Sequence, residues 1–143
     1  MKLTGLLGKR LKDDEILEVL EHYDMEVIYA FDRTHEGMPD QYWAQAKPHG
    51  FQLGFDEHQV LNVVFCYVAP SEGFSPIDSS IIGAPVHRAF GEAESYCKQN
   101  SLAYRVSDPS RPGWWLKVEG SNPWLHYQFK DNRIFRVTLS SPK

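Results

Sequence analysis

Two segments of the chain share one pattern, and this repeat constrains the fold more than any other feature of the sequence. Residues 53–65 and residues 127–139 align at an offset of 74, and each reads as a strand, a short polar turn and a second strand. Apolar residues partly alternate in both segments, as they do in strands with one buried face. The turns at residues 56–59 and 130–133 have the polar composition of tight hairpin connections. We therefore expect two antiparallel hairpins.

The segments that precede the hairpins also match. Residues 6–8 (Leu-Leu-Gly) and residues 81–83 (Ile-Ile-Gly) align at an offset of 75. A helix is expected after each of them. The first follows Asp13, which is a suitable N-cap, and the second begins near Pro85 and ends at Asn100. Candidate strands follow at residues 25–31, 102–106 and 114–118.

This order predicts an α+β fold built from two tandem helix-plus-hairpin modules, at about residues 1–69 and 81–141, joined by a linker at residues 70–80. Half of a 143-residue chain makes a marginal core by itself, so the modules are expected to share one antiparallel sheet in a single domain, residues 1–143. Both helices would pack on one face of that sheet. The other face would then stay partly open, as antiparallel sheets permit.

Composition and charge narrow the class of protein. Hydrophobic residues make up 42% of the chain and charged residues 24%, which favours a packed core over disorder. The formal net charge is −4, which argues against a nucleic-acid partner because binding phosphate needs a basic patch. No apolar run has the length of a membrane span and no signal peptide is visible, so we expect a cytoplasmic protein without a membrane partner. Cys66 and Cys97 are then expected to be reduced, buried side chains.

The motifs that usually carry catalysis are missing from the sequence. The six His residues form neither HxH nor HExxH, and no GxSxG, P-loop or GxGxxG pattern occurs. We therefore predict a protein that is not an enzyme, with no catalytic residue, no metal and no cofactor. The alternative is an enzyme with a dispersed site that uses His126 and Asp131.

Two surface features suggest a protein partner. Carboxylates gather around the first helix, where they form either a solvated helix face or a negative surface that meets a basic partner. Two pairs of adjacent aromatic residues are the second feature. Tyr42-Trp43 lies in a polar segment that is expected to be a loop, and the side chains of Trp114-Trp115 must point to opposite sides of their strand. Packing in the core or at an edge is the alternative for each Trp. The candidate partner-binding residues are Asp14, Glu18, Glu21, Tyr42, Trp43, Trp114, Trp115 and Trp124.

Several of these segments together resemble a family of small cytoplasmic immunity proteins that bacteria encode beside polymorphic or type VI-secreted toxins. The resemblance lies in residues 7–9, Asp13-Asp14, Tyr42-Trp43, residues 50–56, residues 60–65 and residues 73–76. The tandem layout is also similar to that of the β-lactamase inhibitor proteins, which grip an enzyme with a concave sheet. Those proteins are secreted and disulfide-bonded, so that likeness is architectural.

Both resemblances imply an inhibitor that works by occlusion. The function expected from them is an immunity protein that binds and neutralises a cognate toxin, for example a nuclease, by covering its active site or substrate groove. The alternative is a non-catalytic structural or adaptor module in a protein complex. An open sheet face or a free edge strand would also allow a homodimer.

Overall fold

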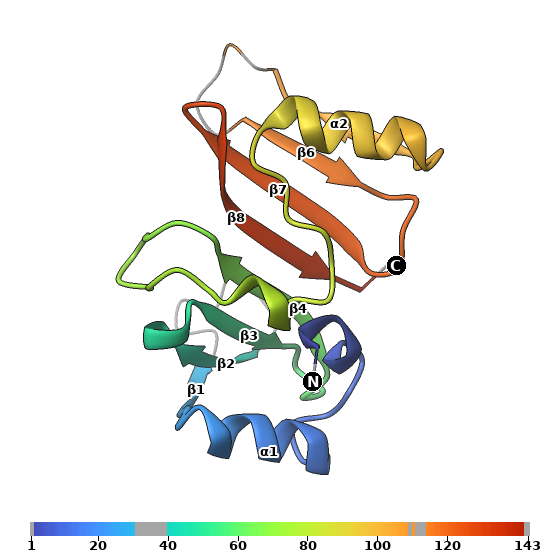
Figure 1. Cartoon of the computed structure of the whole chain (residues 1–143). Helices are drawn as coiled ribbons and strands as arrows, with labels where there is room; N and C mark the ends of the chain where they lie inside the picture. Colours follow the sequence, from blue (N-terminus) through green and yellow to red (C-terminus); the bar gives the residue numbers. More distant parts are fainter. Residues whose placement is uncertain (1, 31–39, 109, 111–113, 142–143) are drawn as a thin grey trace.

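The chain forms one eight-stranded antiparallel sheet with two α-helices. Figure 1 shows the computed structural model, which describes residues 2–30, 40–108, 110 and 114–141. The strand order is β1-β2-β3-β4-β8-β7-β6-β5. The α+β class and the single antiparallel sheet predicted from the sequence are thereby confirmed. The strands are β1 (Val27–Ala30), β2 (Gln41–Ala46), β3 (Phe51–Phe55), β4 (Leu61–Tyr67), β5 (Tyr104–Val106), β6 (Trp115–Val118), β7 (Trp124–Lys130) and β8 (Arg133–Ser140).

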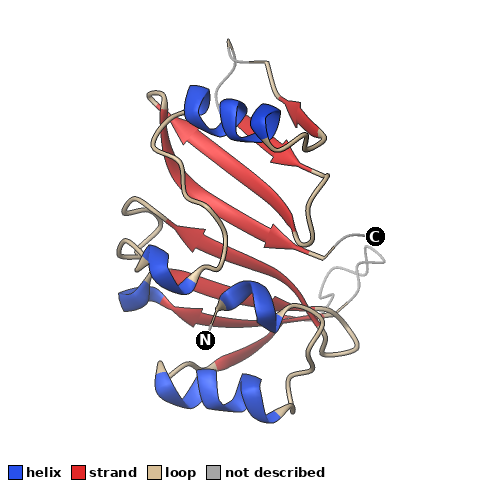
Figure 2. Cartoon of the chain, turned by 45° about the vertical axis from the view of Figure 1, so that its right-hand side comes forward, coloured by secondary structure: helices blue, strands red, loops and turns tan. Residues whose placement is uncertain are grey.

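The two α-helices cover one face of this sheet, as Figures 1 and 2 show. Helix α1 (Asp14–His22) buries Ile16 and Val19, and α2 (Phe90–Gln99) buries Ala93 and Cys97. These side chains share one hydrophobic core with the inward residues of β2, β3, β4, β6, β7 and β8. Three short 3-10 helices complete the described helical segments: η1 (Leu3–Leu6), η2 (Lys47–His49) and η3 (Ser79–Ile81).

Helix α1 begins and ends where its charges favour it. Asp14 and Glu15 lie in its first turn, where their negative charges suit the positive end of the helix dipole, and the helix ends at His22. Helix α2 begins at Phe90, so the start expected near Pro85 is wrong. The four residues after Pro85 belong to no helix, and Ala89 has an extended backbone at the N-cap position. The C-terminal end was predicted correctly: Asn100 caps α2, and its side-chain amide donates to the carbonyl of Tyr96 at 2.8 Å.

The segment around Tyr42 and Trp43 is a strand and not a loop. It forms β2, which pairs with β1 on one side and β3 on the other. The sequence repeat predicts that the two hairpins align at a single offset of 74, but their turns differ in length by one residue. Phe55 pairs with Leu61 across the first turn, and Phe129 pairs with Ile134 across the second. An offset of 74 therefore holds for β3 and β7 but becomes 73 for β4 and β8.

The remaining expectations concern the cysteines and the membrane. Cys66 and Cys97 are both buried and unbridged, as expected. Burial raises the pKa of both thiols. Among the described residues, no helix combines the length and the apolar character that crossing a bilayer requires.

Candidate protein-binding face

The sheet face opposite the helices, here called the open face, is assembled from alternate residues of neighbouring strands. Strand register places these residues in rows that run across the sheet, because side chains of directly paired residues point to the same side. The described part of the chain places no helix over this face (Figure 2). One row consists of Ile28, Trp43, Gly54, Val63, Ser140 and Trp124. The next row consists of Gln45, Gln52, Phe65, Thr138, His126 and Lys117.

In the first half of the chain, the Trp43 side chain lies flat on the open face. A Cβ atom added at Gly54 would lie 2.7 Å from Cζ3 of the Trp43 ring, so the indole packs directly on the glycine backbone. The ring also stacks on Phe65, with 5.8 Å between centroids and 19° between planes. Trp43 and Phe65 are each half-buried, which leaves part of both rings exposed to solvent.

In the second half, Trp115 and Trp124 flank Lys117 and His126. The Lys117 ammonium lies 4.6 Å from the centroid of the Trp124 ring, a cation–π arrangement. Trp115 meets His126 edge-on, with 5.3 Å between centroids. All four side chains are half-buried. Aromatic rings with exposed parts beside cationic groups are typical of the residues that anchor protein–protein interfaces.

Arg136 lies between the two halves, near the middle of the open face. Its guanidinium carbon is 5.1 Å from the centroid of Phe65, and its Nε donates to Oε1 of Gln128. Tyr67, the next residue in this row, is fully buried because its ring stacks on Phe74 at 4.2 Å. The guanidinium is thus held by Gln128 and Phe65, and it lies 5.9 Å from the ring of Tyr67, whose hydroxyl donates to the Glu72 carboxylate at 3.4 Å.

The same region contains a buried hydroxyl group and a histidine with a lowered pKa. The hydroxyl of Thr138 has no hydrogen-bond partner in the described structure, although the residue is only 8% exposed. Its neighbour His126 has a pKa lowered to about 4, first by burial and then by the positive charges of Lys117 and Arg136. The imidazole is therefore neutral near pH 7.

The eight candidate residues from the sequence do not form one surface. Trp43, Trp115 and Trp124 lie on the open face, whereas the other five lie on the side of the sheet that carries the helices. The charged members of that second group, Asp14, Glu18 and Glu21, are exposed on α1. A rigid partner that covers the open face cannot reach them at the same time.

Tyr42 and Trp114 are the two aromatic members on the helix side. Tyr42 packs against the core and stacks on Tyr29 with 5.0 Å between centroids. Trp114 packs against Phe90 and Phe129, at 4.5 and 5.8 Å between ring centroids, and its buried indole nitrogen has no hydrogen-bond partner among the described residues. The adjacent pair therefore points to opposite sides, as expected, with Trp115 on the open face.

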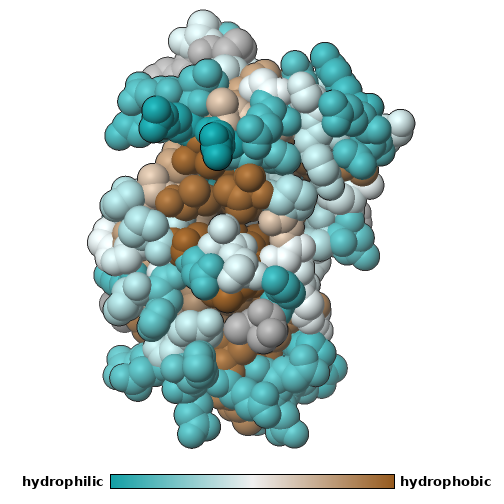
Figure 3. Space-filling model, in the orientation of Figure 1, coloured by the Kyte–Doolittle hydropathy of each residue, from teal (hydrophilic) through white to brown (hydrophobic). Residues whose placement is uncertain are grey.

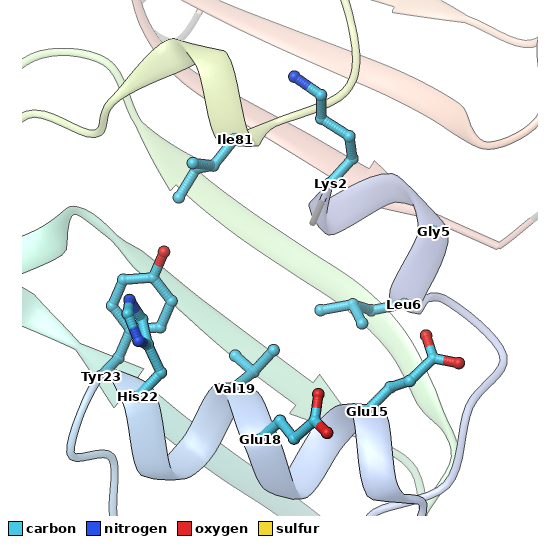
Figure 4. A pocket seen from close by; sticks show the side chains of 9 residues that line it. All are labelled: Lys2, Gly5, Leu6, Glu15, Glu18, Val19, His22, Tyr23 and Ile81. Carbon is cyan, nitrogen blue, oxygen red and sulfur yellow. The ribbon is translucent and has the colours of Figure 1, made fainter.

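A pocket of about 670 Å³ lies on the helix side, between α1 and the 3-10 helices η1 and η3. Figure 4 shows Leu6, Val19 and Ile81 pointing into it, while the Lys2 side chain points away. The Lys2 ammonium donates to the carbonyl of Ser80. Figure 3 shows the same side of the molecule, with polar atoms over both helices and apolar atoms gathered between them.

His126 and Asp131, the two residues suggested for a dispersed enzyme site, do not lie side by side. His126 lies in the middle of β7, whereas Asp131 lies in the turn after it, five residues or roughly 16 Å along the chain. No group of three or more His, Cys, Asp or Glu side chains in the described ranges is arranged to hold a metal ion.

Sequence patterns could have found part of the open face. Alternation in residues 124–130 identifies Trp124 and His126 as facing the same side, and Lys117 follows Trp115 at the same spacing. Arg136 and Thr138 gave no such signal, because their role depends on the pairing of β4 with β8. No family model, curated protein or solved structure matches this chain.

Proposed function

We propose that this chain is a cytoplasmic immunity protein that neutralises a cognate bacterial toxin by laying the open face over the toxin's active site or substrate groove. The observation that carries the proposal is the group of half-buried aromatic rings on that face, contributed by four strands: Trp43, Phe65, Trp115 and Trp124. Inhibition by occlusion needs a broad, rigid surface with aromatic anchors. Eight strands at about 4.8 Å spacing give a face roughly 34 Å wide.

We also propose that the fold consists of two copies of one module, each with a helix and four strands. Both hairpins carry a register shift at the same place, between Gly54 and Phe55 and between Gln128 and Phe129. The 3-10 segments that begin the copies are each followed by a glycine of positive φ, 87° at Gly8 and 85° at Gly83.

The pairing of β4 with β8 supports the same duplication. Adding 73 to the number of a residue in β4 gives the number of the equivalent residue in β8. Val63 pairs with Ser140, and the counterparts of these two, Arg136 and Tyr67, pair with each other. This is the pattern of a local two-fold axis through the pair Phe65–Thr138. Joining two modules in this way places their open faces side by side, which doubles the area available to a partner.

Capture from the native host tests the functional proposal. A tagged wild-type protein and a Trp115→Ala/Trp124→Ala variant would each be used to isolate partners, which mass spectrometry would identify. A variant with Leu17→Ala is the matched control, because Leu17 is 47% exposed on α1 and lies away from the open face. The proposal predicts one stoichiometric partner for the wild type and the control, and its loss in the Trp variant.

Growth assays then separate the immunity role from the alternative of a structural or adaptor module. The captured partner should arrest growth when it is expressed alone, and co-expression of this chain should restore growth. A partner that is harmless alone would support the adaptor function. Capture that is identical for all three proteins would contradict the assignment of the open face.

A homodimer through β1 is a separate proposal. Among the described strands this edge strand pairs with β2 alone, and its residues Val27 and Ile28 are 39% and 52% exposed. A free edge with apolar side chains can pair with the same strand of a second copy. Analytical ultracentrifugation of the wild type and an Ile28→Lys variant tests this, since the variant should be monomeric.

A further inference from the structure

The eight strands differ in charge from the rest of the molecule. The chain carries 19 acidic and 15 basic residues, yet none of the described strand residues is Asp or Glu. The basic residues in the strands all belong to β5–β8, whereas β1–β4 contain no charged residue. They are Arg105, Lys117, Lys130, Arg133 and Arg136. An acidic protein therefore has a sheet whose second half is cationic.

Lys117 and Arg136 differ from Arg105 in their surroundings. Arg105 forms an ion pair with Glu119, so its charge is balanced. Within the described residues, neither Lys117 nor Arg136 forms an ion pair. Each is instead held against an aromatic ring, Trp124 for Lys117 and Phe65 for Arg136. Both cations are thus half-buried and oriented, and no described carboxylate forms an ion pair with either of them. Glu72 comes nearest to Arg136 through Tyr67, whose hydroxyl donates to Glu72 at 3.4 Å and whose ring lies 5.9 Å from the guanidinium.

His126 and Thr138 occupy the space between these cations. Register places Lys117 beside His126, His126 beside Thr138, and Arg136 two residues before Thr138 on the same side of β8. The buried Thr138 hydroxyl lacks a partner, and both cations lower the pKa of His126. The site therefore combines two positive charges that form no ion pair within the described residues with a hydroxyl that has no partner there, which is a set of groups that suits an anion.

We propose that the open face of β6, β7 and β8 binds a carboxylate-bearing segment of the partner protein, with Lys117 and Arg136 as the groups that receive the carboxylates. This proposal rests on the proposed function in one respect, namely that the partner is a protein. It gives that partner an acidic docking segment, whereas the carboxylates of α1 suggested a basic one. Trp115 and Trp124 would contact the apolar side chains next to the carboxylates.

A protein carboxylate fits these observations better than a nucleic acid does. A polyanionic strand needs a continuous track of cations along its path. The cations here are confined to one half of the sheet, and β1–β4 offer none to continue the track.

The test titrates the ¹⁵N-labelled full chain with a short peptide of alternating Glu and Gly, at low ionic strength. The probes are the indole N–H signals of Trp115 and Trp124. A peptide with Gln in place of Glu is the neutral comparison, and a single-stranded oligothymidine is the nucleic-acid comparison. The proposal predicts that the Glu peptide shifts both indole signals and that the Gln peptide shifts neither.

Three variants localise the binding. Lys117→Gln and Arg136→Gln should each weaken the affinity for the Glu peptide by about three- to tenfold, the effect of losing one ion pair. Arg136→Lys keeps the charge and should retain most of the binding, which separates a charge effect from a packing effect at Phe65. Lys98→Gln removes the same charge on α2, beyond the sheet, and should change nothing.

Unchanged affinity in both Gln variants, or no shift with the Glu peptide, would overturn the proposal. Tighter binding of the oligothymidine than of the Glu peptide would overturn it in favour of a nucleic acid. Partner capture is measured separately. If Trp115→Ala/Trp124→Ala abolishes capture while Lys117→Gln and Arg136→Gln leave it intact, the binding face stands and the acidic partner segment fails. If the peptide binds at Lys117 and Arg136 but the Trp115→Ala/Trp124→Ala variant captures the partner as well as the wild type does, the proposed function fails and the anion site stands.

Discussion

Phe65 in β4 lies directly opposite Thr138 in β8, at the centre of the eight-stranded sheet. Both side chains point to the open face, so the residues that flank them belong to one surface. Trp43 stacks on Phe65 from the first half of the chain, and His126 pairs with Thr138 from the second. The central strand pair therefore joins the aromatic residues of both halves into one candidate binding face.

The packing of Trp43 depends on a glycine, and this gives a prediction for stability. A methyl group at Gly54 would lie 2.5 Å from Cγ1 of Val63 and 2.7 Å from the Trp43 ring, so these side chains must move. Gly54→Ala should reduce the free energy of unfolding by about 1–3 kcal/mol. Urea denaturation measures this value.

Gly91→Ala is the matched control for that change. No atom lies within 4 Å of a Cβ at this position in α2, and alanine favours helix over glycine. It should stabilise the protein by about 0.5–1 kcal/mol. A Gly54→Ala variant as stable as the wild type would show that Trp43 is not packed tightly on the open face.

The neighbouring residues Trp114 and Trp115 should affect different properties. Trp114 packs on Phe90 and Phe129 at the helix side, so Trp114→Ala should lower the free energy of unfolding by about 3–5 kcal/mol. Trp115 is on the open face, so Trp115→Ala should cost about 2 kcal/mol or more of partner binding with a smaller effect on stability. Thermal denaturation and calorimetric titration measure the two quantities. If Trp114→Ala weakened partner binding and Trp115→Ala instead caused the larger loss of stability, the orientation of this pair would be contradicted.

His126 should make folding stability depend on pH. Its pKa falls to about 4 in the folded protein, below the usual value near 6.5 of an unfolded chain. Between these values the unfolded state binds more protons than the folded state, so stability should decrease as the pH falls from about 6.5 to about 4. His87, whose pKa is also lowered by burial, contributes in the same direction.

Replacing His126 with Gln should flatten the stability curve between pH 6.5 and pH 4. Lys117→Gln should raise the pKa of His126, because it removes one of the positive charges that lower it. An NMR titration of the imidazole measures this shift. If His126→Gln leaves the slope of unfolding free energy against pH unchanged, the buried environment assigned to His126 is contradicted.

Local patterns predicted the hairpins and α1, because both depend on short-range periodicity. β2 was missed because Gln41 and Gln45 look like loop residues, although they alternate with inward-facing side chains. The start of α2 was placed too early because Pro85 suits a first helical turn, whereas the chain continues to Ala89 before the helix begins. For β2, pairing with β1 and β3 overrode the local signal.

The binding face was harder to predict than the fold. Adjacency showed that Trp114 and Trp115 point to opposite sides, but it could not show which side the helices cover. Asp14, Glu18 and Glu21 are three of the candidates from α1, and only the three-dimensional structure places them across the sheet from the Trp residues. The cationic character of the open face also depends on the pairing of β8 with β7, which sequence spacing does not reveal.

The most direct test of the open face compares two variants in calorimetric titrations with the captured partner. One carries Trp43→Ala and Trp115→Ala, on the open face, and the other carries Asp14→Asn, Glu18→Gln and Glu21→Gln, on α1. We predict a loss of at least about 2 kcal/mol of binding free energy for the first and wild-type affinity for the second. Wild-type affinity for the Trp variant together with weakened binding for the α1 variant would contradict our account and place the interface on the helix side.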